Sequence, residues 1–178
     1  MNERTRKAIF ESFNQLLSKT DLDRITVRMI AENAGVSKAT FYRYFKDKYD
    51  VMAYNYKVFV DNRVNPSASG SYEELLYLLY RDSENSMDYL QNAFKYVGVN
   101  SFTDYVYKYS FDIVERITLA NRPSGLTQSE IMQLDVFSHG VSKMFTNWIL
   151  GKYRLNAGSA ARALYEMMPE SLKHYWWV

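Results

Sequence analysis

The stretch ITVRMIAENAGVSKATFYRYFKDK, Ile25–Lys48, indicates a fold more directly than any other part of the chain. Thr26 and Ser37 each precede a helical pattern, where a hydroxyl can accept a hydrogen bond from an unpaired amide of the first turn. Gly35 separates the two patterns, and glycine adopts the positive φ of a tight turn without steric cost. The stretch therefore predicts two short helices joined by a turn.

The second of these helices is basic and aromatic, which is typical of a helix-turn-helix motif that binds duplex DNA. Its apolar residues and those of the first helix would pack the pair together: Ile30, Ala31, Ala34, Val36, Phe41 and Phe45. The outward positions of the second helix are then Lys38, Ala39, Thr40, Tyr42, Arg43 and Tyr44. Cations and hydroxyls suit phosphate contacts, and short side chains let bases approach.

The same stretch resembles the DNA-binding signature of the TetR family of bacterial transcriptional regulators, roughly T-apolar-x-x-I-A-x-x-A-G-V-S-x-x-T-F-Y-x-Y-F-x-x-K. The resemblance implies phosphate contacts from Thr26, Thr40, Tyr42 and Lys48, and base-edge contacts from Arg28, Lys38, Ala39 and Tyr44. The complete expected set of DNA-binding residues is Thr26, Arg28, Ser37, Lys38, Ala39, Thr40, Tyr42, Arg43, Tyr44 and Lys48.

The distribution of charge agrees with a polyanion-binding N-terminal end. Residues 1–48 hold ten Lys/Arg and six Asp/Glu, a net charge of +4, whereas the whole 178-residue chain carries only +2. Such asymmetry suggests a nucleic-acid partner. The absence of cysteine excludes disulfides and thiolate metal sites, and no apolar run is long enough to cross a bilayer. We expect a cytoplasmic protein without a signal peptide or a membrane span.

The rest of the chain shows helical periodicity and no alternation of strand type. We expect an all-α protein of about nine helices, with a helix-turn-helix domain at residues 1–48, motif about 26–45, and a helical ligand-binding and dimerisation domain at residues 49–178. A long helix should run from Asp47 to about Arg63, followed by a linker at Asn65–Ser71.

The C-terminal region carries a further, more local resemblance. AFKYVGVNSF and NWILGKY are similar to the same region of a small, mainly Firmicutes-type TetR subgroup, which includes an activator of dihydroxyacetone kinase genes. A regulator of the TetR family commonly has a small-molecule cavity inside its helical body, so the family resemblance implies one here.

The 16 tyrosines could serve a packed core or a ligand cavity. Core packing explains most of them, but aromatic residues with polar tips also suit a small-molecule site. The candidate pocket residues are Tyr56, Tyr89, Phe102, Tyr105, Tyr109, His139 and Trp148. We expect no enzyme, metal or cofactor, because two histidines and no glycine-rich phosphate loop leave no catalytic constellation.

Apolar stripes on the last two long helices predict a two-fold homodimer, which would bind a palindromic operator. The candidate interface residues are Phe137, Gly140, Met144, Ala161, Leu164, Tyr165 and Met168, although the same stripes could face only the core of their own subunit.

Taken together, these patterns predict a sequence-specific DNA-binding regulator, a dimeric repressor controlled by an unknown small-molecule effector. Two alternatives stay open: an activator of the same family, and a DNA-independent helical ligand-binding or scaffolding protein.

Overall fold

The computed structural model describes residues 2–63, 71–98, 101–122 and 124–173, and this part of the chain contains helices and no β-strand. The predicted all-α fold is therefore confirmed. The α-helices are α1 (Glu3–Leu17), α2 (Val27–Asn33), α3 (Lys38–Tyr42), α4 (Lys48–Asp61), α5 (Tyr72–Ser83), α6 (Met87–Lys95), α7 (Phe102–Asn121), α8 (Gln128–Ile149), α9 (Ala157–Glu166) and α10 (Glu170–Lys173). Two 3₁₀ turns are η1 (Leu22–Arg24) and η2 (Glu84–Ser86). The expectation of about nine helices omitted only α10, a single turn after Pro169.

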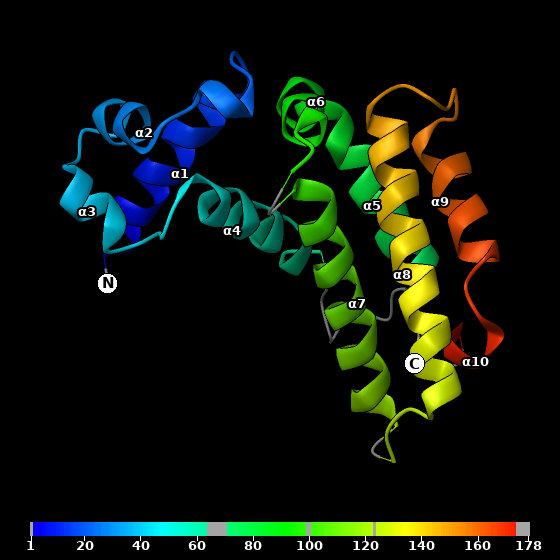
Figure 1. Cartoon of the computed structure of the whole chain (residues 1–178). Coiled ribbons are helices and arrows are strands. Elements are labelled where there is room, and N and C mark those ends of the chain that lie inside the picture. The colour runs from blue at the N-terminus through cyan, green and yellow to red at the C-terminus, as the bar shows by residue number, and fades with distance from the viewer. Residues whose placement is uncertain (1, 64–70, 99–100, 123, 174–178) are drawn as a thin grey trace.

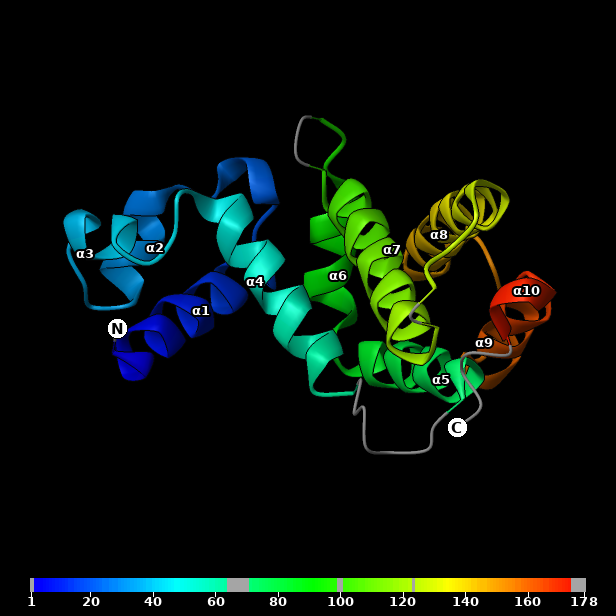
Figure 2. The ribbon, with the colours of Figure 1, turned by 90° about the horizontal axis from the view of Figure 1, so that it is seen from below.

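The helices form a small head and a larger body, joined by α4 (Figure 1). The head consists of α1, α2 and α3, and α1 packs against α2, α4 and α6. In the body α5 packs against α9, α7 packs against α8, and α4 packs against α7. Figure 2 shows the same order from below, with α4 running from the head to the bundle. We refer to α1–α3 as the head and to α5–α10 as the body.

Local capping forms the head as the sequence predicted. The Thr26 hydroxyl accepts a hydrogen bond from the Met29 amide at 3.2 Å, and the Ser37 hydroxyl accepts one from the Thr40 amide at 3.0 Å. Gly35 has a φ of +66°, in the left-handed region that glycine tolerates. The buried core of the head contains Ile9, Phe13, Ile30, Ala31, Phe41 and Phe45.

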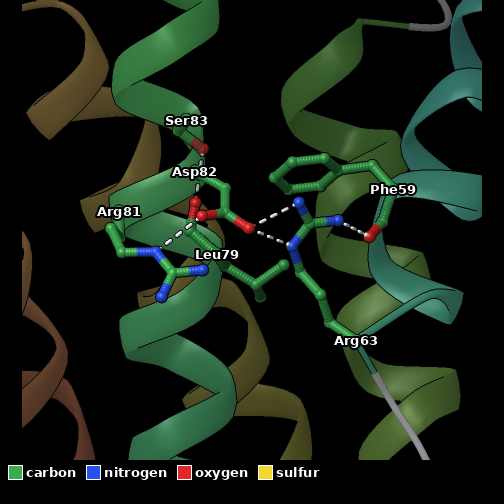
Figure 3. A network of polar contacts seen from close by, with 6 residues as sticks. All are labelled: Phe59, Arg63, Leu79, Arg81, Asp82 and Ser83. Atoms are coloured by element: carbon green, nitrogen blue, oxygen red, sulfur yellow. Dashed lines mark hydrogen bonds and ion pairs between the residues drawn. The ribbon is translucent and has the colours of Figure 1, made fainter.

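Helix α4 is anchored at both ends. Its first residue, Lys48, donates hydrogen bonds to backbone carbonyls next to α2, which we describe below. Just past its last turn, Arg63 donates from Nε and Nη2 to Asp82 Oδ2 on α5, at 2.9 and 2.6 Å (Figure 3). The same guanidinium bonds the Phe59 carbonyl and lies 3.8 Å from the centroid of the Phe59 ring. These contacts tie α4 to the head and to the body.

The body core is mainly aromatic. The Tyr80 ring lies 4.8 Å from Trp148 and 5.1 Å from Phe145, and Phe94 lies 4.7 Å from Phe102, all between ring centroids. The predicted linker lies outside the described residues except for Ser71, whose hydroxyl caps α5. Within the described residues, no helix is both long enough and apolar enough to cross a membrane.

Candidate functional site

The outer surface of α2 and α3 carries most of the residues that the sequence predicts for DNA binding. The exposed ones are Thr26, Arg28, Ser37, Lys38, Ala39, Tyr42 and Arg43, while Thr40 and Tyr44 are half-buried. The Tyr42 side chain is 57% exposed and packs edge-on against the buried Phe41 ring. Buried aromatic residues thus support α3 from below, and its polar residues face outward, where a groove of DNA could receive them.

Arg28 and Tyr44 are expected contact residues whose side chains also bond other residues of the head. Arg28 Nε forms an ion pair with Glu32 Oε1 at 2.7 Å, one helical turn further along α2. The Tyr44 hydroxyl accepts a hydrogen bond from the Asn2 amide at 3.2 Å, so it lies beside the start of α1. Arg28 can exchange an exposed ion pair for a DNA contact at little cost, whereas Tyr44 also supports the N-terminus of the head.

Lys48 lies where the sequence did not predict it. Its Nζ atom donates to the carbonyl oxygens of Leu22 at 2.7 Å and Ile25 at 2.9 Å, and approaches that of Asp23 at 3.4 Å. Partial burial lowers the pKa of the Lys48 ammonium from its ordinary value. This geometry favours a structural role for Lys48 over the expected phosphate contact, because its N–H groups are already directed at backbone carbonyls.

Residues 9–54 match the family model described as bacterial regulatory proteins, tetR family. These residues are a TetR-family domain. The match spans the end of α1, all of α2 and α3, and the first half of α4. No curated protein sequence matches the chain.

Solved structures with the TetR fold extend the likeness to the body. The chain is similar to the dihydroxyacetone kinase operon activator DhaS, at 14% identity and a TM-score of 0.66, over 96% of this chain and 97% of that one. It is also similar to the fatty acid degradation regulator FadR from Bacillus halodurans, at 15% identity and a TM-score of 0.61, over 92% and 94%. A third similar structure is a TetR transcriptional regulator from Rhodococcus sp. RHA1, at 17% identity and a TM-score of 0.63, over 93% of this chain and 94% of that one.

At these identities the likeness to solved structures concerns the fold. Together with the domain match, it shows that the chain has the DNA-binding domain and the fold of a TetR-family transcriptional regulator.

A cavity of about 440 Å³ lies where the head, α4 and the body meet. It is lined by Asn14, Ser18, Asn55, Tyr56, Phe59, Ser83, Glu84, Asn85, Ser86, Met87, Asp88, Tyr89, Leu90, Phe102 and Phe145. We call it the junction cavity. Three of the predicted pocket residues, Tyr56, Tyr89 and Phe102, contribute to its wall. Burial raises the pKa of Tyr56 and Tyr89, so both phenols are neutral at physiological pH.

The other predicted pocket residues lie elsewhere. Tyr109 borders a separate space of only about 30 Å³, and Tyr105 borders a groove of about 220 Å³ between α4 and α7. His139 is exposed on α8 and stacks on Tyr107, with 3.6 Å between ring centroids. Trp148 is core: its Nε1 donates to the Leu155 carbonyl at 2.7 Å. The expectation that these four residues line one pocket is therefore corrected.

One hydrogen-bonded bridge in the wall of the junction cavity was not predicted. Asn55 Nδ2, on α4, donates to Asn14 Oδ1 on α1 at 2.7 Å and to the Tyr89 hydroxyl on α6 at 2.9 Å. We call Asn14, Asn55 and Tyr89 the amide bridge. It joins the head, α4 and the body through a single side chain. The sequence held one signal, since Asn55 is an isolated amide in the otherwise mostly apolar run VMAYNYKVFV.

The predicted dimer residues divide into two groups. Phe137, Ala161, Leu164 and Met168 are buried inside their own subunit, whereas Met144 and Tyr165 are half-buried and Gly140 is exposed. Phe137, for example, packs on Tyr72 with 5.7 Å between ring centroids. The buried four are therefore corrected to core positions, because a side chain already covered cannot contact a partner. On α8 and at the C-terminal end of α9, the exposed large apolar residues are instead Met132, Val136 and Met167.

Proposed function

We propose that the protein is a homodimeric transcriptional repressor of the cytoplasm, which binds a palindromic operator and releases it when a small molecule binds the body. The observation that carries this proposal is the TetR-family domain, whose Lys38, Tyr42 and Arg43 side chains are exposed on α3 and its C-terminal end. The proposed division is a DNA-binding domain at residues 1–48 and a ligand-binding and dimerisation domain at residues 49–178.

The surface proposed to contact DNA combines two kinds of residue. Thr26, Ser37, Thr40 and Tyr42 offer hydroxyl groups, which suit phosphate oxygens, and Arg28, Lys38 and Arg43 add positive charge. Ala39 is exposed on α3 and is short enough to let a base edge approach. Because α3 spans only Lys38–Tyr42, one head can read few base pairs. Two heads on a two-fold dimer give the specificity that one lacks.

The proposed dimer surface is the exposed side of α8. Met132, Val136 and Gly140 recur at a spacing of four, which aligns them along one face of the helix. The Met132 and Val136 side chains are 65% and 69% exposed. A Cβ atom built on Gly140 would meet no other atom within 4 Å, so a partner helix could approach closely there. A stable dimer needs burial of roughly 1,200–2,000 Å² in total.

Helix α4 supports the proposed switch, because it lies between the effector site and the head. A ligand in the junction cavity would contact Asn55 and Tyr56 on α4, and Lys48 would carry any tilt of that helix to the segment leading into α2. The ligand must favour one spacing of the heads over the other. A tenfold loss of operator affinity requires only about 1.4 kcal/mol of such preference.

The experiment that tests the function is footprinting on the DNA flanking the protein's own gene, together with selection of binding sites from random duplex DNA. Repression predicts a protected palindrome that overlaps the promoter. Protection only upstream of the promoter would favour the activator, and failure to enrich any sequence would favour the DNA-independent alternative. Lys38→Ala should enrich a different sequence from wild type, whereas Lys152→Ala, at an exposed lysine of the body, is the matched control and should enrich the wild-type sequence.

A further inference from the structure

The junction cavity has an aromatic interior and an acidic edge. Phe102 and Phe145 contribute rings from α7 and α8, and Tyr56 and Phe59 contribute rings from α4. Glu84 and Asp88, at η2 and the start of α6, contribute carboxylates and are exposed. The lining residues include no Lys, Arg or His. A ligand therefore meets apolar ring faces and negative charge, and no fixed positive charge.

The two carboxylates at the edge are not neutralised by ion pairs within the described residues. The neighbouring Asp82 behaves differently, because Arg63 and Arg81 both bond its carboxylate (Figure 3). Arg63 also covers the Phe59 ring, and its guanidinium donates to Asp82 and to the Phe59 carbonyl. Because Arg81 bonds the same carboxylate, Asp82 balances only one of the two positive charges. Arg63 and Arg81 are thus engaged with Asp82, whereas Glu84 and Asp88 have no ion-pair partner among the described residues. The two arginines and the three carboxylates carry formal charges of +2 and −3, so the edge of the cavity has an excess of negative charge.

The amide bridge offers hydrogen-bonding capacity inside the same space. The Tyr89 hydroxyl accepts from Asn55 Nδ2, but no residue in the described ranges accepts the hydroxyl's own proton. Likewise Asn55 donates twice from Nδ2, and its Oδ1 has no donor among the described residues. One donor and one acceptor in the cavity wall are therefore open to a ligand.

From these three observations we propose that the junction cavity binds an amphipathic organic amine, with its ammonium group at Glu84 and Asp88 and its apolar part among the aromatic rings. Ring faces attract cations and carboxylates pair with them, so both parts of the wall favour the same ligand class. Carboxylic acids would meet like charge from Glu84 and Asp88, the charged residues that line the cavity. A volume of about 440 Å³ is within the usual range for small-molecule sites. The inference rests on the proposed function, whose effector site it specifies.

The test compares three ligands that share one apolar part: 4-phenylbutylamine, 4-phenylbutan-1-ol and 4-phenylbutyrate, each titrated calorimetrically into the full-length protein without DNA. We expect the amine to bind about tenfold more tightly than the alcohol, and the carboxylate to bind most weakly, because exposed carboxylates and ring faces each attract the ammonium modestly.

Two double variants locate the charge effect. Glu84→Gln/Asp88→Asn should weaken amine binding about fivefold and leave the alcohol unchanged. Glu74→Gln/Asp112→Asn removes the same charge from exposed positions outside the cavity, so it should leave both affinities unchanged. Equal affinity for amine and alcohol, or equal effects of the two double variants, would overturn the proposal. Thermal unfolding of each variant separates lost binding from lost folding.

Measurements of operator affinity distinguish the proposed amine site from the proposed function of an effector-controlled repressor. If the amine binds with the predicted charge dependence but operator affinity does not change, the ligand site stands and the effector-controlled repressor is overturned. If operator affinity responds to the alcohol or the carboxylate as strongly as to the amine, the regulatory function stands and the amine site is overturned.

Discussion

The Lys48 Nζ atom lies 2.7 Å from the Leu22 carbonyl oxygen, so the first residue of α4 is hydrogen-bonded to the turn that precedes α2. Replacing it by methionine keeps the aliphatic stem and removes the donors. We expect Lys48→Met to lower the free energy of unfolding by about 1–2 kcal/mol, through loss of charge-assisted hydrogen bonds at a partly exposed site. Urea unfolding measures this change.

The salt dependence of DNA binding supplies the opposite test for Lys48. A lysine that neutralises a phosphate contributes about 0.9 to the slope of log K against log salt. We expect Lys48→Met to leave that slope unchanged. An unchanged unfolding free energy combined with a smaller slope would show that the ammonium contacts DNA instead.

Lys38 and Tyr42 are predicted to affect DNA binding in different ways. Lys38→Ala should change the preferred operator sequence, because a base contact discriminates among bases by about 1–3 kcal/mol. Tyr42→Phe should weaken binding to all sequences by about fivefold, the effect of one lost phosphate hydrogen bond. Parallel selections from random DNA with wild type and both variants measure this; identical sequence preference in Lys38→Ala would contradict the proposed orientation of α3.

Asn55 is predicted to couple the head to the body. Asn55→Leu removes both hydrogen bonds of the amide bridge and should lower the free energy of unfolding by about 1–2 kcal/mol. It should also reduce any effect of a cavity ligand on operator affinity. Asn55→Asp is the matched control, because its oxygens can accept from the Tyr89 hydroxyl and the Asn14 amide. Full ligand response in Asn55→Leu would mean that the signal takes another route.

Val136 is predicted to lie in the dimer interface. Val136→Glu would place two carboxylates near the two-fold axis, which costs several kcal/mol and should raise the dimer dissociation constant by about a hundredfold. Leu119→Glu changes another exposed apolar residue, on α7, and should leave the dimer intact. Light scattering at micromolar concentration measures the oligomeric state of both variants. If Val136→Glu were dimeric as well as Leu119→Glu, the proposed interface on α8 would be wrong.

Glu130 is predicted to make the start of α8 sensitive to acid. Hydrogen bonds from the Thr127 hydroxyl and amide, and from Arg122, lower the pKa of Glu130 from 4.5 to about 2. The folded-state pKa lies below the ordinary value, so the associated stability is present above pH 4.5 and is lost as the pH falls toward 2. The difference in unfolding free energy between wild type and Glu130→Gln should therefore shrink over that range. A difference independent of pH would contradict it.

The head was predictable from sequence because its determinants are local. Thr26, Ser37 and Gly35 act on neighbouring amides and on their own dihedral angles, and these roles can be inferred from a single stretch. The position of Lys48 was equally visible, but its partners lie 23 to 26 residues earlier in the chain. Spacing alone could not show which way its side chain turns.

The body was less predictable because α8 is covered by neighbours on more than one side. Phe137 and Val136 are adjacent apolar residues, yet the first is buried and the second is 69% exposed. Helical periodicity identifies both stripes and cannot say which one faces the core of its own subunit. The junction cavity depends on seven elements that meet in space, so the sequence indicated only some of its wall: the aromatic residues Tyr56, Tyr89 and Phe102, and the isolated amide of Asn55.

The double anchoring of α4 has a consequence for building hybrid regulators. The Tyr54 ring on α4 packs edge-on against Phe10 and Phe45 of the DNA-binding region, at 6.4 and 5.6 Å between centroids. A head transplanted with a junction at residue 48 would lose these contacts and the Asn14 partner on α4. A junction placed after Arg63 would carry α4 along as part of the portable unit. The recipient body must then have an acidic residue at the position of Asp82, because otherwise Arg63 at the C-terminal end of α4 would have no carboxylate to pair with.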